Sequence, residues 1–168
     1  PSKDKAWAEA EQTRLELDLT QGYIVIHGGS LAEHQQKGAA NIYPKSSWQA
    51  LIKGFQQRQP DVPVVLVQSP GDREWFKSLE VCPGLKVSTP QDLGKFAALI
   101  SGANLMVSTD SDAMHVAVAA GTKLFALFGP SDPERVLPKD ERFVALRSPT
   151  GKVSDIAPIQ VLEKIWGK

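Results

Sequence analysis

The segment 105–133 carries the residues of this sequence that are best suited to chemistry. It reads LMVSTDSDAMHVAVAAGTKLFALFGPSDP, so an apolar run ends at Ser108 and a polar turn, 109–112, leads into a run of small residues. A helix that begins at the carboxyl end of a strand points backbone N–H groups and its positive dipole end at that edge. The pattern therefore predicts a site for an anion such as a phosphate.

A second apolar run, 124–128, ends in the loop 129–133, with the sequence GPSDP. The two prolines restrict the backbone of this loop. Because the carboxyl ends of parallel strands meet at one edge of a sheet, we expect the loop to form the wall beside the anion site.

Short apolar runs alternate with helical patterns along most of the chain. The predicted strands are 23–27, 64–68, 85–87, 105–108, 124–128 and 143–146. The predicted helices are 2–17, 46–58, 72–81, 91–102, 112–120 and 154–166. Strands that are apolar on both faces and are followed by helices indicate a parallel sheet covered on both sides. We therefore expect an α/β fold, a Rossmann-like three-layer sandwich.

Two long stretches, 28–45 and 129–141, are expected to be irregular. Both follow the carboxyl end of a strand, where open α/β sheets bind their ligands. Loops of this length within a compact domain are usually functional.

The bulk composition excludes several classes of protein. The 168 residues include 19 basic and 19 acidic side chains, so no net positive charge favours nucleic acid. The one cysteine, Cys82, cannot form a disulfide within the chain, and no apolar run is long enough to span a bilayer. We expect a cytoplasmic protein. The chain begins at Pro1 without a methionine or an apolar leader, so we expect a piece of a longer protein.

The segment 105–133 resembles glycosyltransferase family 9, the heptosyltransferases, which transfer heptose from ADP-heptose to the inner core of lipopolysaccharide. Asp110, Ser111 and His115 match the family's Asp-Ser/Thr-Gly-x-x-His pattern. The residues 128–133 match its Phe/Tyr-Gly-Pro-Thr/Ser-x-Pro pattern. Weaker similarities lie at 23–30, 43–48 and 66–72.

The resemblance implies one half of a GT-B fold, in which two Rossmann-like halves face each other across a cleft. Residues 1–20 would be a leading helix or linker, and 21–168 the C-terminal domain that binds an ADP-heptose-like donor. The expected partners are a missing N-terminal Rossmann-like domain and a glycan or lipid-linked acceptor, which places the protein in the cytoplasm or at the inner face of the membrane. The family's general base lies in the N-terminal half, so the chain alone is expected to be inactive.

The resemblance also assigns binding roles. The start of the helix at 112–120 would hold the donor's diphosphate, the loop after the first strand would approach the phosphates, and Asp72 would bind the ribose hydroxyls. The predicted donor-binding residues are Gly29, Ser30, Asp72, Asp110, Ser111, Asp112, Met114, His115, Gly129, Pro130 and Ser131. No residue is predicted to be catalytic, and neither a metal site nor a cofactor is predicted.

Other interpretations remain open. Asp110 and Ser111 could cap a helix, Asp72 could do the same, and His115 could be a core residue. Asp112 stands where the family has glycine, Asn41 where it has a basic residue, and Gly28-Gly29 where it has Pro-Gly. These three departures favour a non-catalytic GT-B domain that serves as a scaffold or binding module. A GT-B epimerase shares the layout, but the loop 129–133 favours a transferase. A dinucleotide-dependent oxidoreductase lacks support because no G-x-G-x-x-G follows the first strand.

Overall fold

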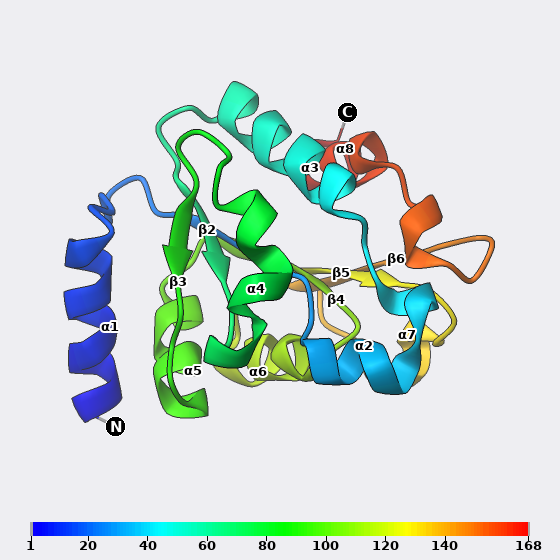
Figure 1. The fold of residues 1–168 in the computed structure, drawn as a ribbon, viewed down its shortest axis with the longest axis horizontal. Helices are drawn as coiled ribbons and strands as arrows, with labels where there is room; N and C mark the ends of the chain where they lie inside the picture. Colours follow the sequence, from blue (N-terminus) through cyan, green and yellow to red (C-terminus); the bar gives the residue numbers. More distant parts are fainter. Residues whose placement is uncertain (1, 168) are drawn as a thin grey trace.

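The computed structural model describes residues 2–167 and contains one sheet of six parallel strands (Figure 1). The strands are β1 (Ile24–His27), β2 (Val64–Val67), β3 (Lys86–Ser88), β4 (Leu105–Thr109), β5 (Leu124–Phe128) and β6 (Phe143–Arg147). Each corresponds to a predicted strand, and the α/β prediction is confirmed.

The strand order is β3-β2-β1-β4-β5-β6. The chain adds β2 and β3 on one side of β1 and then crosses to the other side of it for β4. In a doubly wound sheet this reversal opens a crevice at the carboxyl ends of the two central strands, where ligands bind. Here the order reverses between β1 and β4, so ligands are expected at the carboxyl ends of these two strands.

The helices cover both faces of the sheet. In Figure 1, α3 (Lys45–Arg58) and α8 (Pro158–Trp166) lie over one face, and α5 (Leu93–Ser101) and α6 (Asp112–Ala120) lie over the other. Successive strand residues alternate between the two cores, so Ile24 belongs to the first and Val25 to the second. This double burial explains why the strands read as continuous apolar runs.

The first helix, α1 (Ser2–Arg14), packs against α5. Ser88 Oγ donates a 2.5 Å hydrogen bond to Glu11 Oε2, and Gln12 Nε2 donates one of 3.1 Å to the Tyr23 hydroxyl. The helix is therefore attached to the sheet by polar contacts as well as by Ala8 and Leu15, whose side chains are buried. A domain boundary near residue 20 stays a prediction.

The segment 72–81 is not the single helix that was predicted. It consists of η2 (Pro70–Asp72), α4 (Arg73–Phe76) and η3 (Lys77–Leu79). Phe76 and Leu79 are both buried, and a spacing of three residues matches the 3₁₀ helix, in which side chains at i and i+3 eclipse.

The prediction that 28–45 and 129–141 are wholly irregular is also wrong. The first contains α2 (Leu31–Lys37) and η1 (Ala39–Asn41), and the second contains α7 (Pro133–Val136). Ser30 and Glu33 form a capping box at the start of α2, a pattern that the sequence shows but that the prediction did not use. Among residues 2–167, no helix is long and apolar enough to cross a bilayer.

Candidate functional site

Gly29 brings the loop after β1 against the end of β4. Its φ is +84°, and a Cβ at this position would lie 3.1 Å from His34 Nε2 and 3.4 Å from Thr109 Oγ1. A side chain would be strained by the backbone conformation and would crowd these neighbours. Glycine thus allows the loop after β1 to lie against the carboxyl end of β4.

The start of α6 follows β4 directly, at the same edge of the sheet. Ser111 is the N-cap residue, but its side chain makes no capping hydrogen bond; its Oγ lies 3.3 Å from Ser108 Oγ. The interpretation of Ser111 as a simple side-chain cap is therefore wrong. The Asp112 N–H instead donates a 2.9 Å hydrogen bond to Glu33 Oε2 of α2.

Glu33 links the starts of two helices. Its Oε1 accepts a hydrogen bond from the Ser30 N–H at 3.3 Å, and the Ser30 hydroxyl accepts one from the Glu33 N–H at 3.1 Å. The structure thus brings predicted residues Ser30 and Asp112 together through a carboxylate that sequence reasoning had not selected.

The predicted residues of the turn and α6 differ in exposure. Asp112 and His115 are exposed, which rules out the core interpretation of His115. Asp110 is 7% exposed, and Met114 is fully buried in the core. Met114 can therefore offer a ligand only its backbone, whereas the imidazole of His115 is open to solvent.

The loop after β5 lies against other elements. A Cβ on Gly129 would lie 2.6 Å from the Ala40 carbonyl oxygen and 3.0 Å from that of Gly151, so only glycine fits. Pro130 is exposed and Ser131 is half-buried. Gly129 and Pro130 line an open hollow that Arg147 and residues 148–151 complete.

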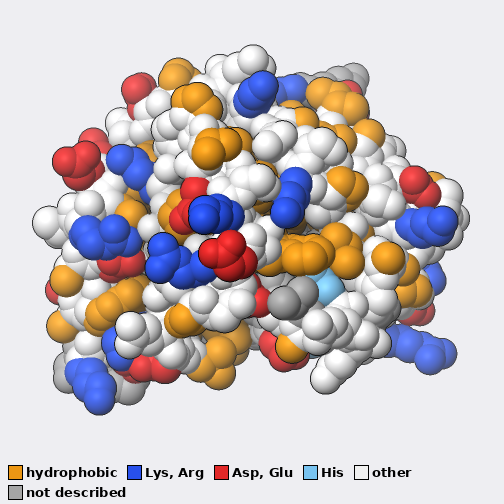
Figure 2. All heavy atoms as spheres, viewed as in Figure 1, with side chains coloured by type: hydrophobic (Ala, Val, Ile, Leu, Met, Phe, Trp, Pro, Cys, Tyr) orange, Lys and Arg blue, Asp and Glu red, His pale blue; other side chains and the backbone are white. Residues whose placement is uncertain are grey.

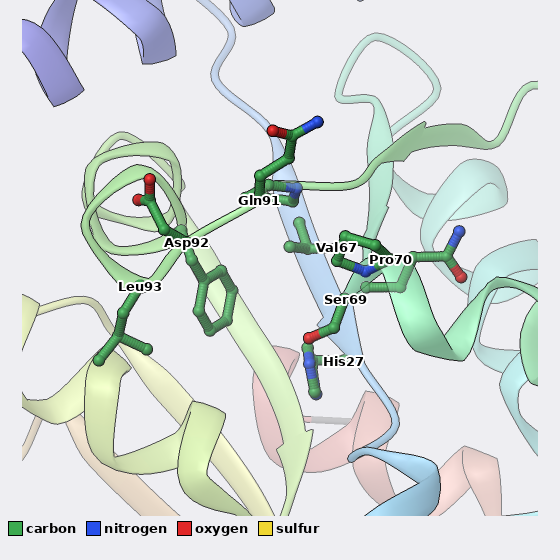
Figure 3. A pocket seen from close by; sticks show the side chains of 10 residues that line it. His27, Val67, Ser69, Pro70, Gln91, Asp92 and Leu93 are labelled. Carbon is green, nitrogen blue, oxygen red and sulfur yellow. The ribbon is translucent and has the colours of Figure 1, made fainter.

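A cavity of about 190 Å³ lies at the carboxyl ends of β1 and β2. In Figure 3, Asp92 and Leu93 lie on one side of it, and Ser69 and Pro70 on the other. Its lining residues are His27, Val67, Gln68, Ser69, Pro70, Pro90, Gln91, Asp92, Leu93 and Phe96. The walls combine flat or apolar side chains with a few polar groups, as small-molecule sites do.

His27, at the end of β1, lines this cavity. Its Nδ1 accepts a 3.0 Å hydrogen bond from the Gly29 N–H, so the proton of the neutral ring resides on Nε2. Burial lowers the pKa of His27 to about 4, and the charge of His34 contributes to the shift. The ring is therefore neutral near pH 7.

Asp72 does not line the cavity. Its side chain is 6% exposed, within η2. Asp92 does line the cavity. Its side chain accepts a 2.9 Å hydrogen bond from the Lys95 N–H and forms an ion pair with the Lys95 ammonium at 2.7 Å. The Lys95 hydrogen bond lowers the pKa of Asp92.

Sequence reasoning missed the cavity residues on the loop 90–93. Their signal was their position after the strand β3, since ligands bind at the carboxyl ends of such strands.

Figure 2 shows basic and acidic side chains mixed over the face it presents, without a surface of one sign. No group of three or more His, Cys, Asp or Glu in the described part of the chain could hold a metal ion.

A family model described as glycosyltransferase family 9 (heptosyltransferase) matches residues 2–165. The chain belongs to this family. No curated protein matches it. The predicted membership of glycosyltransferase family 9 is thereby confirmed.

Solved structures of the family have the same fold. The structure of Escherichia coli ADP-heptose lps heptosyltransferase II is 25% identical with a TM-score of 0.76, and the match covers 99% of this chain and 51% of that one. The family 9 glycosyl transferase from Veillonella parvula DSM 2008 is 22% identical with a TM-score of 0.83, over 98% of this chain and 51% of that one. E. coli heptosyltransferase WaaC with ADP is 22% identical with a TM-score of 0.77, over 95% and 48%. The chain thus spans about half the length of the solved structures it matches.

Proposed function

We propose that this chain is the donor-binding half of a GT-B glycosyltransferase, which transfers heptose or another sugar from an ADP-heptose-like nucleotide to a lipopolysaccharide or other glycan acceptor. Family membership and the match to half of each related structure support the proposal. The observation that carries it is the junction of the Gly29 loop, the start of α6 and the cavity at the point where the strand order reverses.

The cavity suits the nucleoside end of the donor. Its apolar walls can pack on a flat heterocycle, and the His27 Nε2–H can donate to an oxygen or nitrogen of the ligand. The diphosphate would then extend towards Gly29, Ser30 and the first turn of α6. The structure of WaaC holds ADP, which has both of these parts.

The chain would bind and orient the donor and stabilise the departing nucleoside diphosphate. Backbone N–H groups and the dipole at the start of α6 favour negative charge, and this charge grows on the phosphate when the glycosidic bond breaks. The exposed imidazole of His115 lies on the same helix. The base that accepts the proton of the acceptor hydroxyl would come from the other half of the enzyme.

A non-catalytic binding module is the second candidate, and the carboxylates near the start of α6 favour it. Glu33 accepts a hydrogen bond from the Asp112 N–H, and Asp110 and Asp112 stand on either side of the N-cap residue Ser111. Like charges at this position oppose the entry of a diphosphate.

Titration calorimetry with ADP, UDP and GDP tests the proposal. We expect saturable binding of at least one of them and a Tm that rises once the ligand exceeds its Kd. His115→Ala should weaken this binding without lowering the Tm of the free protein, because the side chain is exposed. Gln57→Ala, an exposed change on α3, is the matched control.

Absence of binding at millimolar concentration of all three nucleotides would contradict the donor-binding role. Equal binding by the His115→Ala and Gln57→Ala variants would show that His115 does not contribute to the nucleotide site.

A further inference from the structure

The carboxylate of Glu33 occupies a position that suits a phosphate oxygen. Its Oε2 accepts the Asp112 N–H at 2.9 Å, across 79 positions of sequence. Carboxylate and phosphate oxygens are the same kind of acceptor for an N–H group at the start of a helix. A single N–H group therefore cannot donate a full hydrogen bond to a carboxylate oxygen and to a phosphate oxygen at once.

Glu33 is held there by its own helix. Its Oε1 accepts the Ser30 N–H while its backbone N–H donates to the Ser30 hydroxyl, so the capping box of α2 orients the carboxylate. The other carboxylate oxygen then reaches α6, whose N-cap residue makes no side-chain cap of its own. An acidic side chain from another element thus takes the place of the local cap.

We infer that Glu33 competes with the diphosphate of the donor for the start of α6 and thereby sets the affinity of the site. The inference rests on the proposed function. Donor binding must release the Asp112 N–H from Glu33, so it separates the starts of α2 and α6. The His34 Nε2–H, which donates a 2.9 Å hydrogen bond to the Gly28 carbonyl, keeps α2 attached to the loop after β1 when the bond from Asp112 to Glu33 is released.

The Glu33→Gln variant tests the competition with phosphate while it keeps the capping box at the start of α2. Glutamine keeps an oxygen for the Ser30 N–H, because the capping box accepts Glu or Gln at this position. It has no second oxygen for Asp112, and it carries no charge. The matched control is Glu163→Gln on α8, which makes the same charge change at an exposed position remote from α6.

The two probes are ADP and inorganic pyrophosphate, measured by calorimetry. We expect Glu33→Gln to bind both about fivefold more tightly than the wild type, as for one unit of charge at a helix terminus. Glu163→Gln should bind as the wild type does. In ¹⁵N spectra of the wild type, ADP should shift the amide signal of Asp112, and Glu33→Gln should shift it without ligand.

The outcomes separate this inference from the proposed function. If the wild type binds ADP and Glu33→Gln binds both probes no more tightly than the wild type does, the inferred competition is wrong and the proposed donor site stands. If Glu33→Gln gains affinity for pyrophosphate while neither protein binds a nucleotide, Glu33 has the role inferred and the donor function is wrong. If neither protein binds either probe, both are overturned.

Glu33→Asp is the second variant, should Glu33→Gln unfold. Its carboxylate is one methylene shorter and cannot reach both the Ser30 and Asp112 N–H groups as Glu33 does. It should therefore gain affinity too, though less than Glu33→Gln because the charge remains. Unchanged affinity in a folded Glu33→Asp would contradict the inference.

Discussion

At the scale of single residues, Asp112 lies at the first position of α6, where its carboxylate has opposite effects on the helix and on a bound diphosphate. It is exposed, and a negative charge in the first turn stabilises the helix. The same charge repels phosphate. Asp112→Asn should therefore tighten nucleotide binding by about 1 kcal/mol, and Asp112→Gly by a similar amount, while both lower the Tm slightly. Calorimetry and thermal unfolding check the two effects.

The two variants distinguish charge from steric blocking. If Asp112→Gly tightens binding and Asp112→Asn does not, the side chain itself obstructs the phosphate. Unchanged or weaker binding by both variants would mean that the family's diphosphate geometry does not apply to this chain.

His27 makes stability depend on pH. Its pKa is about 4 in the folded chain and near the ordinary 6.5 in the unfolded chain, chiefly because the ring is buried. Between these values the unfolded chain binds a proton that the folded chain does not, so the free energy of unfolding falls as the pH drops from 6.5 towards 4. The loss amounts to at most about 3 kcal/mol.

Urea unfolding at pH 7.5 and 4.5 measures this loss. His27→Asn keeps an oxygen for the Gly29 N–H but does not titrate, so it should show a smaller difference between the two pH values than the wild type. His115→Asn, at an exposed position, is the control and should keep most of the difference. An equal difference in His27→Asn and wild type would contradict the role of His27.

At the scale of elements, α1 is attached to the domain through Glu11. Glu11 is 9% exposed, and its side chain accepts hydrogen bonds from Ser88 and Arg14. The hydrogen bond from the Arg14 side chain is the largest cause that lowers the pKa of Glu11. Glu11→Ala leaves the Ser88 hydroxyl without this partner, so we expect a loss of about 1–3 kcal/mol in the free energy of unfolding. Glu9→Ala, an exposed change on the same helix, should cost far less.

Urea unfolding of both variants checks this prediction. A comparable small loss in the two would show that α1 adds little to the stability of the domain. A large loss for Glu11→Ala alone would extend the folded domain to the start of α1.

At the scale of the whole molecule, we predict that this chain alone transfers no sugar. A GT-B reaction needs donor and acceptor held across a cleft, and this chain matches only about half of each related structure. In the proposed function the acceptor site and the base belong to the other half, so this chain alone should lack both. The test is incubation with ADP-heptose and lipopolysaccharide-core acceptors, followed by mass spectrometry, with E. coli ADP-heptose lps heptosyltransferase II as the positive control. Product from this chain above a heat-denatured control would contradict the two-half account.

The sequence by itself determined the layers of the fold and the family. Continuous apolar runs such as 64–67 and 124–128 can only be buried on both faces, and local periodicity encodes this. The pattern Asp110, Ser111 and His115, followed by the loop 129–133, is a set of short spacings, so it is readable without coordinates. The capping box at Ser30 was equally local, although the prediction did not use it.

Only the tertiary structure decided which of the predicted residues can meet a ligand. Met114 and His115 are neighbours in sequence, yet one is buried and the other exposed, because the helix turns about 100° per residue against a fixed core. The cavity joins residues of β1, β2 and the start of α5, and the bond from Asp112 to Glu33 spans 79 positions. Such contacts depend on the order in which strands pair, and local spacing carries no record of that order.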